Sequence, residues 1–216
     1  MCFSAEVSLA ALILGLGGGA LVWSLDTPFD HIVGAFTAFV ALMQGIEFLL
    51  WRHQRCDTTH KAISVAGMWL NHLQPLVLGG LILLLSTRQD YAWAVESIMA
   101  LYTAIIVPYS LQYTDKGGSH CTVARPNDPH LLWRWNIQDY HRPLYWFFLA
   151  CFVAIGTLGM PTVGQGIVFS VVGVGLYLLS KFLFYQRETV GSLWCFFVAF
   201  VPIVYYIFRI NGFEID

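Results

Sequence analysis

Polar residues inside otherwise apolar stretches are the features of this sequence that could do chemistry. Gln44, Glu47 and Trp51 are spaced three and four residues apart, so on a helix they share one face. A carboxylate at such a position requires a partner or a proton, because an unpaired charge is costly to bury. His72 and Lys181 are the candidate partners. Without a partner, desolvation favours the neutral carboxyl group, and Glu47 could then exchange a proton with His72.

A second group of polar residues lies beside a proline. Asn71, His72 and Gln74 all fall within four residues before Pro75. Because Pro75 lacks a backbone N–H, a helix through this point loses one hydrogen bond and can free the carbonyl of Asn71. We expect the side chains of both groups to meet in one polar cluster with further members from other parts of the chain. Those further members are Cys2, Ser4, Tyr109, Lys181, Ser192, Trp194 and Cys195.

The cysteines and histidines allow a metal site as another use of the same residues. Thiolate and imidazole groups together suit Zn or Cu(I). Their spacing matches no CxxC pair, HxxxH pair or HExxH motif, so they could equally be scattered side chains. Both interpretations stay open. The candidate metal ligands are Cys2, Glu47, His72, His120, Cys121 and Cys195.

The composition indicates the surroundings in which these residues lie. Of the 216 residues, 57% are hydrophobic and 11% are charged, with a formal net charge of −2. Soluble domains carry about 25% charged residues, so this chain cannot cover a water-exposed surface of its size. It also lacks the positive field that nucleic-acid binding requires. The composition therefore excludes a soluble enzyme and a nucleic-acid-binding protein, and it indicates an integral membrane protein embedded in the lipid bilayer.

Seven apolar stretches are long enough to cross a bilayer, which requires about 20 residues per helix. They run over residues 5–25, 31–51, 62–86, 91–113, 143–160, 166–186 and 190–209. The sequence thus predicts an all-α fold, in which residues 1–216 form one polytopic bundle of seven transmembrane helices. Residues 130–135, between the fourth and fifth stretches, are interpreted as a short segment lying in the membrane interface.

Lysine and arginine predict the orientation of this bundle. Nine of the 11 fall on the side of the N-terminus, and only Arg88 and Arg209 fall on the other side. Because cytoplasmic loops are enriched in these residues, we place the N-terminus in the cytoplasm and the C-terminus outside, in a plasma or inner membrane. Cys56 and Cys121 are then expected to be free cytoplasmic thiols. The polar cluster becomes a cytoplasm-facing vestibule, closed toward the outside by apolar packing.

Three short elements carry a resemblance to a known family. The chain opens with Met-Cys-Phe-Ser-Ala, shows a Gln, Glu and Trp pattern over residues 44–51, and has a Ser-x-Trp-Cys element at residues 192–195. On these elements it resembles a family of small polytopic membrane proteins from bacteria and large viruses that begin with the same pentapeptide. The resemblance implies a seven-helix fold and assigns no chemistry.

Three classes of function are compatible with these features. The first is a carrier or channel-like protein for a small solute or ion, with Glu47 and His72 as a proton couple. The second is a membrane-embedded enzyme, with or without a metal, that acts at the cytoplasmic leaflet and uses Cys2 or Cys195 as ligand or nucleophile. The third is a non-catalytic assembly or sensor protein, in which the polar residues only hold the helices together. The proline-broken helix beside a polar vestibule favours the first.

Overall fold

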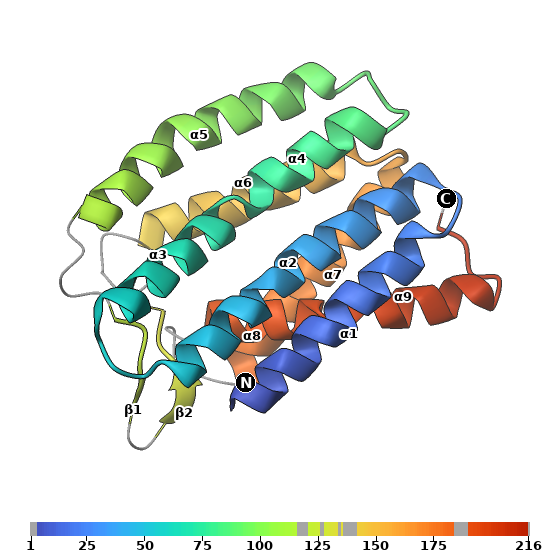
Figure 1. Ribbon diagram of the computed structural model, residues 1–216. Coiled ribbons are helices and arrows are strands. Elements are labelled where there is room, and N and C mark those ends of the chain that lie inside the picture. Colours follow the sequence, from blue (N-terminus) through green and yellow to red (C-terminus); the bar gives the residue numbers. More distant parts are fainter. Residues whose placement is uncertain are drawn as a thin grey trace.

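The computed structural model describes residues 4–115, 121–125, 128–133, 135, 142–183 and 190–215 (Figure 1). The described chain is helical apart from one short hairpin. Its elements are α1 (Ala5–Trp23), α2 (Pro28–Arg52), α3 (Thr58–His72), α4 (Gln74–Leu85), α5 (Ala92–Asp115), β1 (Ala124–Arg125), β2 (Asp128–Leu131), α6 (Arg142–Gly159), α7 (Val163–Leu183), α8 (Val190–Val198) and α9 (Val201–Ile210).

The helices fall on the apolar stretches that the sequence predicted. Among the described residues, five helical segments are long and apolar enough to cross a membrane: α1, α2, α5, α7 and the α8–α9 segment Val190–Ile210. The bent pair of α3 and α4 makes a sixth if it is counted as one span, and α6 is a shorter apolar helix. The all-helical, multi-pass membrane architecture is therefore confirmed.

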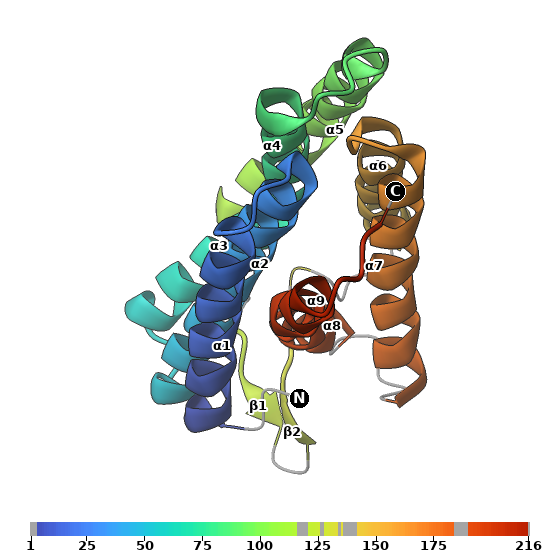
Figure 2. The same cartoon turned by 90° about the vertical axis from the view of Figure 1, so that its right-hand side faces the viewer.

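The helices form two walls with a third element between them. Figure 2 shows α1 to α4 along one side and α6 and α7 along the other, with α8 and α9 viewed nearly end-on between them. Helix α2 is central, because it contacts α1, α3, α4, α8 and α9. The N-terminus and the β1–β2 hairpin lie at one end of the bundle, and the C-terminus lies at the other (Figure 1). We call these the N-terminal end and the C-terminal end.

Helices α1 and α2 approach each other most closely at glycines. A Cβ atom on Gly19 would lie 2.7 Å from the carbonyl oxygen of Gly34, and one on Gly34 would lie 2.7 Å from the carbonyl oxygen of Gly19. Both contacts are with backbone atoms, which cannot move aside as a flexible side chain would. Small residues at this crossing therefore allow the close packing that holds helices together in lipid.

The segment between α5 and α6 packs back onto the α2–α3 connection. Cys56 and Cys121 form a disulfide with their Cα atoms 5.6 Å apart, so the expectation of two free thiols is wrong. The expectation that residues 130–135 lie in the membrane interface stays a prediction, and the described part of this stretch is buried against the protein. Leu131, Leu132 and Trp133 are fully buried, and Trp135 is 1% exposed, because this stretch covers the N-terminal end of the bundle.

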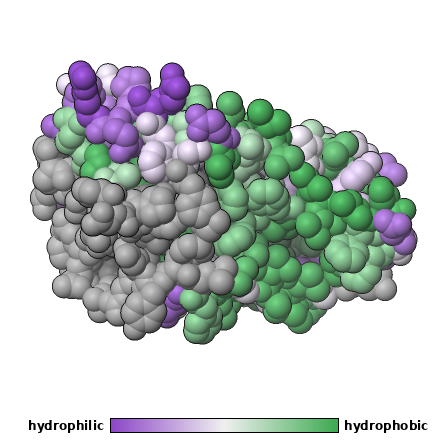
Figure 3. Space-filling model, turned by 90° about the horizontal axis from the view of Figure 1, so that it is seen from below, coloured by the Kyte–Doolittle hydropathy of each residue, from purple (hydrophilic) through white to green (hydrophobic). Residues whose placement is uncertain are grey.

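Hydrophobic side chains cover the outside of the described bundle. Figure 3 shows them across the middle and one end of the face seen from below, whereas hydrophilic residues gather at the opposite end. Large apolar residues such as Ile13, Leu84 and Phe182 are 62%, 82% and 79% exposed. Such a continuous apolar surface is unfavourable in water, and a lipid bilayer would cover it.

Candidate functional site

The third apolar stretch is broken where Pro75 interrupts it. Helix α3 ends at His72, α4 begins at Gln74, and their axes differ by 43°. Pro75 occupies the first turn of α4, where its missing N–H costs least. The hydroxyl of Tyr102 donates a 2.8 Å hydrogen bond to the carbonyl oxygen of His72. A side chain of α5 therefore satisfies a backbone group at the break.

The hydrogen bonds around His72 define its neutral tautomer. Its Nδ1 lies 2.8 Å from the hydroxyl oxygen of Ser110, and that hydroxyl donates its own proton to the carbonyl of Ile106 at 2.8 Å. With its proton directed to Ile106, Ser110 accepts from His72, and on this basis we assign the ring proton to Nδ1. Neutral His72 in this tautomer carries its lone pair on Nε2.

A small polar pocket lies beside this break. The space inside it and at its opening amounts to about 310 Å³, and the side chains with polar groups on its lining are Asn71, His72, Tyr109, Trp135 and Tyr145. Asn71 and His72 are 9% and 6% exposed, so the pocket lies within the bundle rather than on its surface. The Tyr109 hydroxyl donates to the carbonyl of Trp135 at 2.9 Å. The pocket presents imidazole, amide and phenol groups to any small molecule or ion that enters it.

A second polar group lies deeper in the bundle. The Gln74 amide nitrogen is 3.7 Å from the Cys195 sulfur, and the Glu47 carboxylate interacts electrostatically with the same thiol. Glu47, Gln74 and Cys195 are all fully buried. Tyr145, which lines the polar pocket, also interacts electrostatically with Cys195. The structure thus places Gln74 of α4 against Cys195 of α8, and Glu47 of α2 and Tyr145 of α6 act electrostatically on the same thiol.

Other predicted members of the cluster lie elsewhere. Ser4 caps α1 by accepting a hydrogen bond from the Val7 amide at 3.3 Å. Lys181 is exposed, and its ammonium lies 5.9 Å from the ring centre of Trp146, so its prediction as a partner of Glu47 is wrong. The indole of Trp194 donates to the carbonyl of Gly173 at 2.9 Å and so points toward α7.

The remaining predicted members occupy α2, α8 and undescribed parts of the chain. Gln44 is fully buried on α2, and Trp51 is half-buried in the last turn of the same helix. Ser192 is 2% exposed on α8, one turn before Cys195. Cys2 and His120 lie outside the described residues. The set therefore divides into a buried group, helix-end residues and one exposed lysine.

Cys121, one of the predicted metal ligands, is not available to a metal ion. Its sulfur is bonded to Cys56 and cannot act as a thiolate ligand. Within the ranges that the structure describes, no group of three or more His, Cys, Asp or Glu side chains is arranged to hold a metal ion. Among the described residues, Glu47, His72 and Cys195 therefore do not belong to a group that could hold a metal ion.

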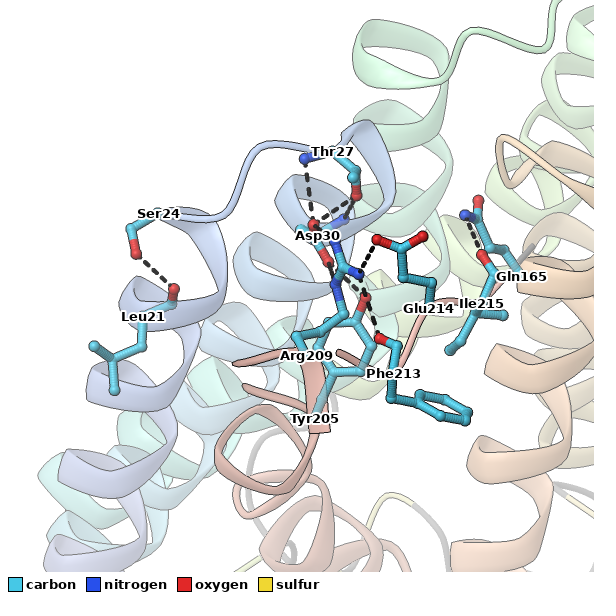
Figure 4. A network of polar contacts seen from close by, with 10 residues as sticks. All are labelled: Leu21, Ser24, Thr27, Asp30, Gln165, Tyr205, Arg209, Phe213, Glu214 and Ile215. Carbon is cyan, nitrogen blue, oxygen red and sulfur yellow. Dashed lines mark hydrogen bonds and ion pairs between the residues drawn. The ribbon is translucent and has the colours of Figure 1, made fainter. Parts of the chain in front are cut away.

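Sequence reasoning missed a polar network at the C-terminal end, drawn in Figure 4. The Tyr205 hydroxyl donates to Asp30 Oδ1 at 2.5 Å, and Arg209 donates to both carboxylate oxygens at 3.2 Å. Asp30 is fully buried, and the Arg209 side chain is 15% exposed. The sequence predicts that the second stretch begins at residue 31, which leaves Asp30 just outside it.

Two signals could have identified this network. Thr27 and Asp30 have the spacing of a capping box, and Pro28 suits a first helical turn. These features predict a helix that begins at residue 28 and carries Asp30 inside it. Arg209 is a cation within the last apolar stretch, and such a residue requires a carboxylate partner.

Comparison with known proteins leaves the fold and the site as the only guides to function. No family model matches the chain, and no curated protein or solved structure shows significant similarity to it. Its apolar helices define an all-helical, multi-pass integral membrane protein.

Proposed function

We propose that this membrane protein carries a small solute or ion, and that the polar pocket beside the α3–α4 break is its binding site. The observation that carries the proposal is that His72 and Asn71, at the end of a broken helix, line a pocket within the bundle. Interrupted helices form substrate sites in many transporters, because backbone and side-chain polar groups become available there. The pocket volume limits the substrate to a small molecule.

A proton couple between His72 and Glu47 is part of the same proposal. Imidazole is the side chain that changes protonation most readily near neutral pH, and the Nδ1 of His72 is held by Ser110 at 2.8 Å. Glu47 lies in the deeper group, which Tyr145 connects to the pocket. Protonation at one group would change the field at the other, which is the requirement for coupling solute and proton movement.

The orientation and the number of spans are further parts of the proposal. We propose seven spans, with the N-terminal end in the cytoplasm of a plasma or inner membrane, on the nine-to-two distribution of Lys and Arg. The Cys56–Cys121 disulfide favours the reverse orientation, because disulfides persist in oxidising compartments. We give the charge distribution more weight, since it combines several loops and the disulfide is one pair.

The buried state of Cys195 bears on the enzyme alternative. Its sulfur is fully buried, whereas a nucleophile must reach its substrate. A fully buried thiol supports the enzyme less than the polar pocket supports the carrier. The third alternative is that the polar cluster is purely structural. In that case a conservative substitution in the cluster should lower stability, whereas in a carrier it should abolish transport.

Membership of the family that begins Met-Cys-Phe-Ser-Ala is also proposed. Two elements of the resemblance, one in α2 and one in α8, meet in space through Glu47 and Cys195. These elements are far apart in the sequence, so their meeting supports a shared site.

The carrier proposal is tested by currents from the reconstituted protein on a solid-supported membrane. Steps of pH are applied with and without a panel of ammonium, phosphate, monocarboxylates and amino acids. We expect a solute-dependent current that His72→Gln abolishes, because glutamine cannot take up a proton. His31→Gln is the matched control. His31 lies near the start of α2 and packs against Trp23 of α1, and it does not line the pocket. Currents equal to those of empty liposomes for all three proteins would overturn the proposal.

The orientation is tested by labelling intact cells with a membrane-impermeant maleimide after mild reduction. We expect Cys56 and Cys121 to react only after the membrane is permeabilised. Labelling of both in intact cells places the N-terminal end outside and reverses the proposed orientation. In parallel, mass spectrometry of peptides prepared without a reductant shows whether the Cys56 and Cys121 peptides are joined by a disulfide in the cell.

A further inference from the structure

A large apolar cavity lies apart from the polar pocket, between the two walls of the molecule. The space inside it and at its opening amounts to about 540 Å³. Residues of α2, α6, α7, α8 and α9 line it, including Phe36, Phe152, Phe169 and Val198. Apolar packing had been expected to close this half of the bundle. The structure instead shows a hydrocarbon-lined space there.

The polar side chains on the lining are already used within the protein. Thr37 donates to the carbonyl of Val33 at 2.7 Å, and the Trp194 indole donates to the carbonyl of Gly173 at 2.9 Å. The Tyr205 hydroxyl donates to Asp30 at 2.5 Å. A polar ligand would lose its hydration here and gain no donor among the described lining residues in return. The chemistry of the cavity therefore selects a hydrocarbon.

The mouth of the cavity faces the surface that the membrane covers. Val168 and Val172 of α7 line the cavity and are 37% and 40% exposed. Their neighbours Ile167 and Val171 are 49% and 64% exposed and belong to the apolar outside of the same helix. Val172 is about 13 Å from the start of α7 by the rise of 1.5 Å per residue, so the mouth opens into the hydrocarbon layer. Lipid chains rather than water have access to it.

We propose that this cavity binds one hydrocarbon chain of a membrane lipid, which enters between α7 and α9 past Val168 and Val172. Apolar cavities of this kind exclude water and take up apolar molecules. The bilayer supplies acyl chains at high local concentration beside the mouth. A bound chain would fill the space between the two walls and hold α7 at its distance from α2. The proposal is independent of the carrier function, because it uses none of the residues that line the polar pocket.

The test uses the full chain reconstituted in phosphatidylcholine vesicles that contain a photoactivatable lipid. One arm uses a phospholipid with a diazirine near the end of its acyl chain, and a second arm uses a free fatty acid with the same group. After irradiation, the labelled residues are mapped by peptide mass spectrometry. We expect labelling of Val168, Phe169 and Val198, and the arm with the stronger labelling identifies the source of the chain.

Two variants on adjacent positions make the test specific. Val172→Trp places an indole in the mouth and should reduce labelling of Phe169 and Val198 at least tenfold. Val171→Trp is the matched control, because Val171 is more exposed and does not line the cavity. It should label like the wild-type protein. Equal labelling of both variants, or labelling spread evenly over the outer face of α7, would overturn the proposal.

Discussion

Helix α2 carries two fully buried carboxylates near its opposite ends, and their surroundings differ. Asp30 lies among Thr27, Tyr205 and the guanidinium of Arg209, all of which donate to it. Glu47 interacts electrostatically with the thiol of Cys195, and Lys181, one of its two candidate partners, is exposed. Equal burial therefore does not imply an equal role. The charge of Asp30 is held by Arg209, and the proton-exchange role proposed above for Glu47 sets the two carboxylates apart.

The largest expected effect is that of Asp30→Asn. The substitution removes the charge that Arg209 faces, so we expect the free energy of unfolding to fall by about 3 kcal/mol. This value is at the lower end for a broken buried pair, because Arg209 is 15% exposed and retains its contact with Glu214 at 3.7 Å. Chemical unfolding in detergent measures the change.

Asp26→Asn is the control for this experiment. Asp26 lies four residues earlier, in the exposed turn between α1 and α2. It should change the free energy of unfolding by less than about 0.5 kcal/mol, as exposed substitutions usually do. If Asp30→Asn is equally mild, Asp30 is not a structural ion-pair partner, and the contrast with Glu47 fails.

Two buried tyrosines sharpen the contrast between a charged and a neutral acceptor. Tyr205 donates to the Asp30 carboxylate, and Tyr102 donates to the carbonyl of His72. Hydrogen bonds to charged groups contribute more, so Tyr205→Phe should cost about 2 kcal/mol and Tyr102→Phe about 1 kcal/mol. The same unfolding measurement compares the two. If Tyr102→Phe costs more than Tyr205→Phe, the hydrogen bond at the α3–α4 break contributes more to stability than the hydrogen bond to Asp30.

These differences show which properties local sequence can predict. The helical segments follow from runs of apolar residues, and the break follows from Pro75, because both depend only on neighbours in the chain. The pairing of Asp30 with Arg209 depends on how α2 and α9 are rotated and placed, which no local pattern encodes. Lys181 was misplaced for the same reason, since its distance from Glu47 depends on the face that α7 presents. Long-range pairing of polar residues therefore required the structure.

The smallest expected effect on stability, and the most informative for function, is that of Glu47→Gln. Glutamine has nearly the shape of a protonated glutamate and keeps its capacity for hydrogen bonds, so we expect a cost of about 1 kcal/mol or less. Transport should nevertheless be lost, because an amide cannot release a proton. Glu96→Gln, on the exposed face of α5, is the matched control and should retain both stability and current. Unfolding and solid-supported-membrane currents are measured on the same preparations. A loss near 3 kcal/mol would make Glu47 a paired structural carboxylate like Asp30, and an unchanged current would end the proposal of proton coupling at this residue.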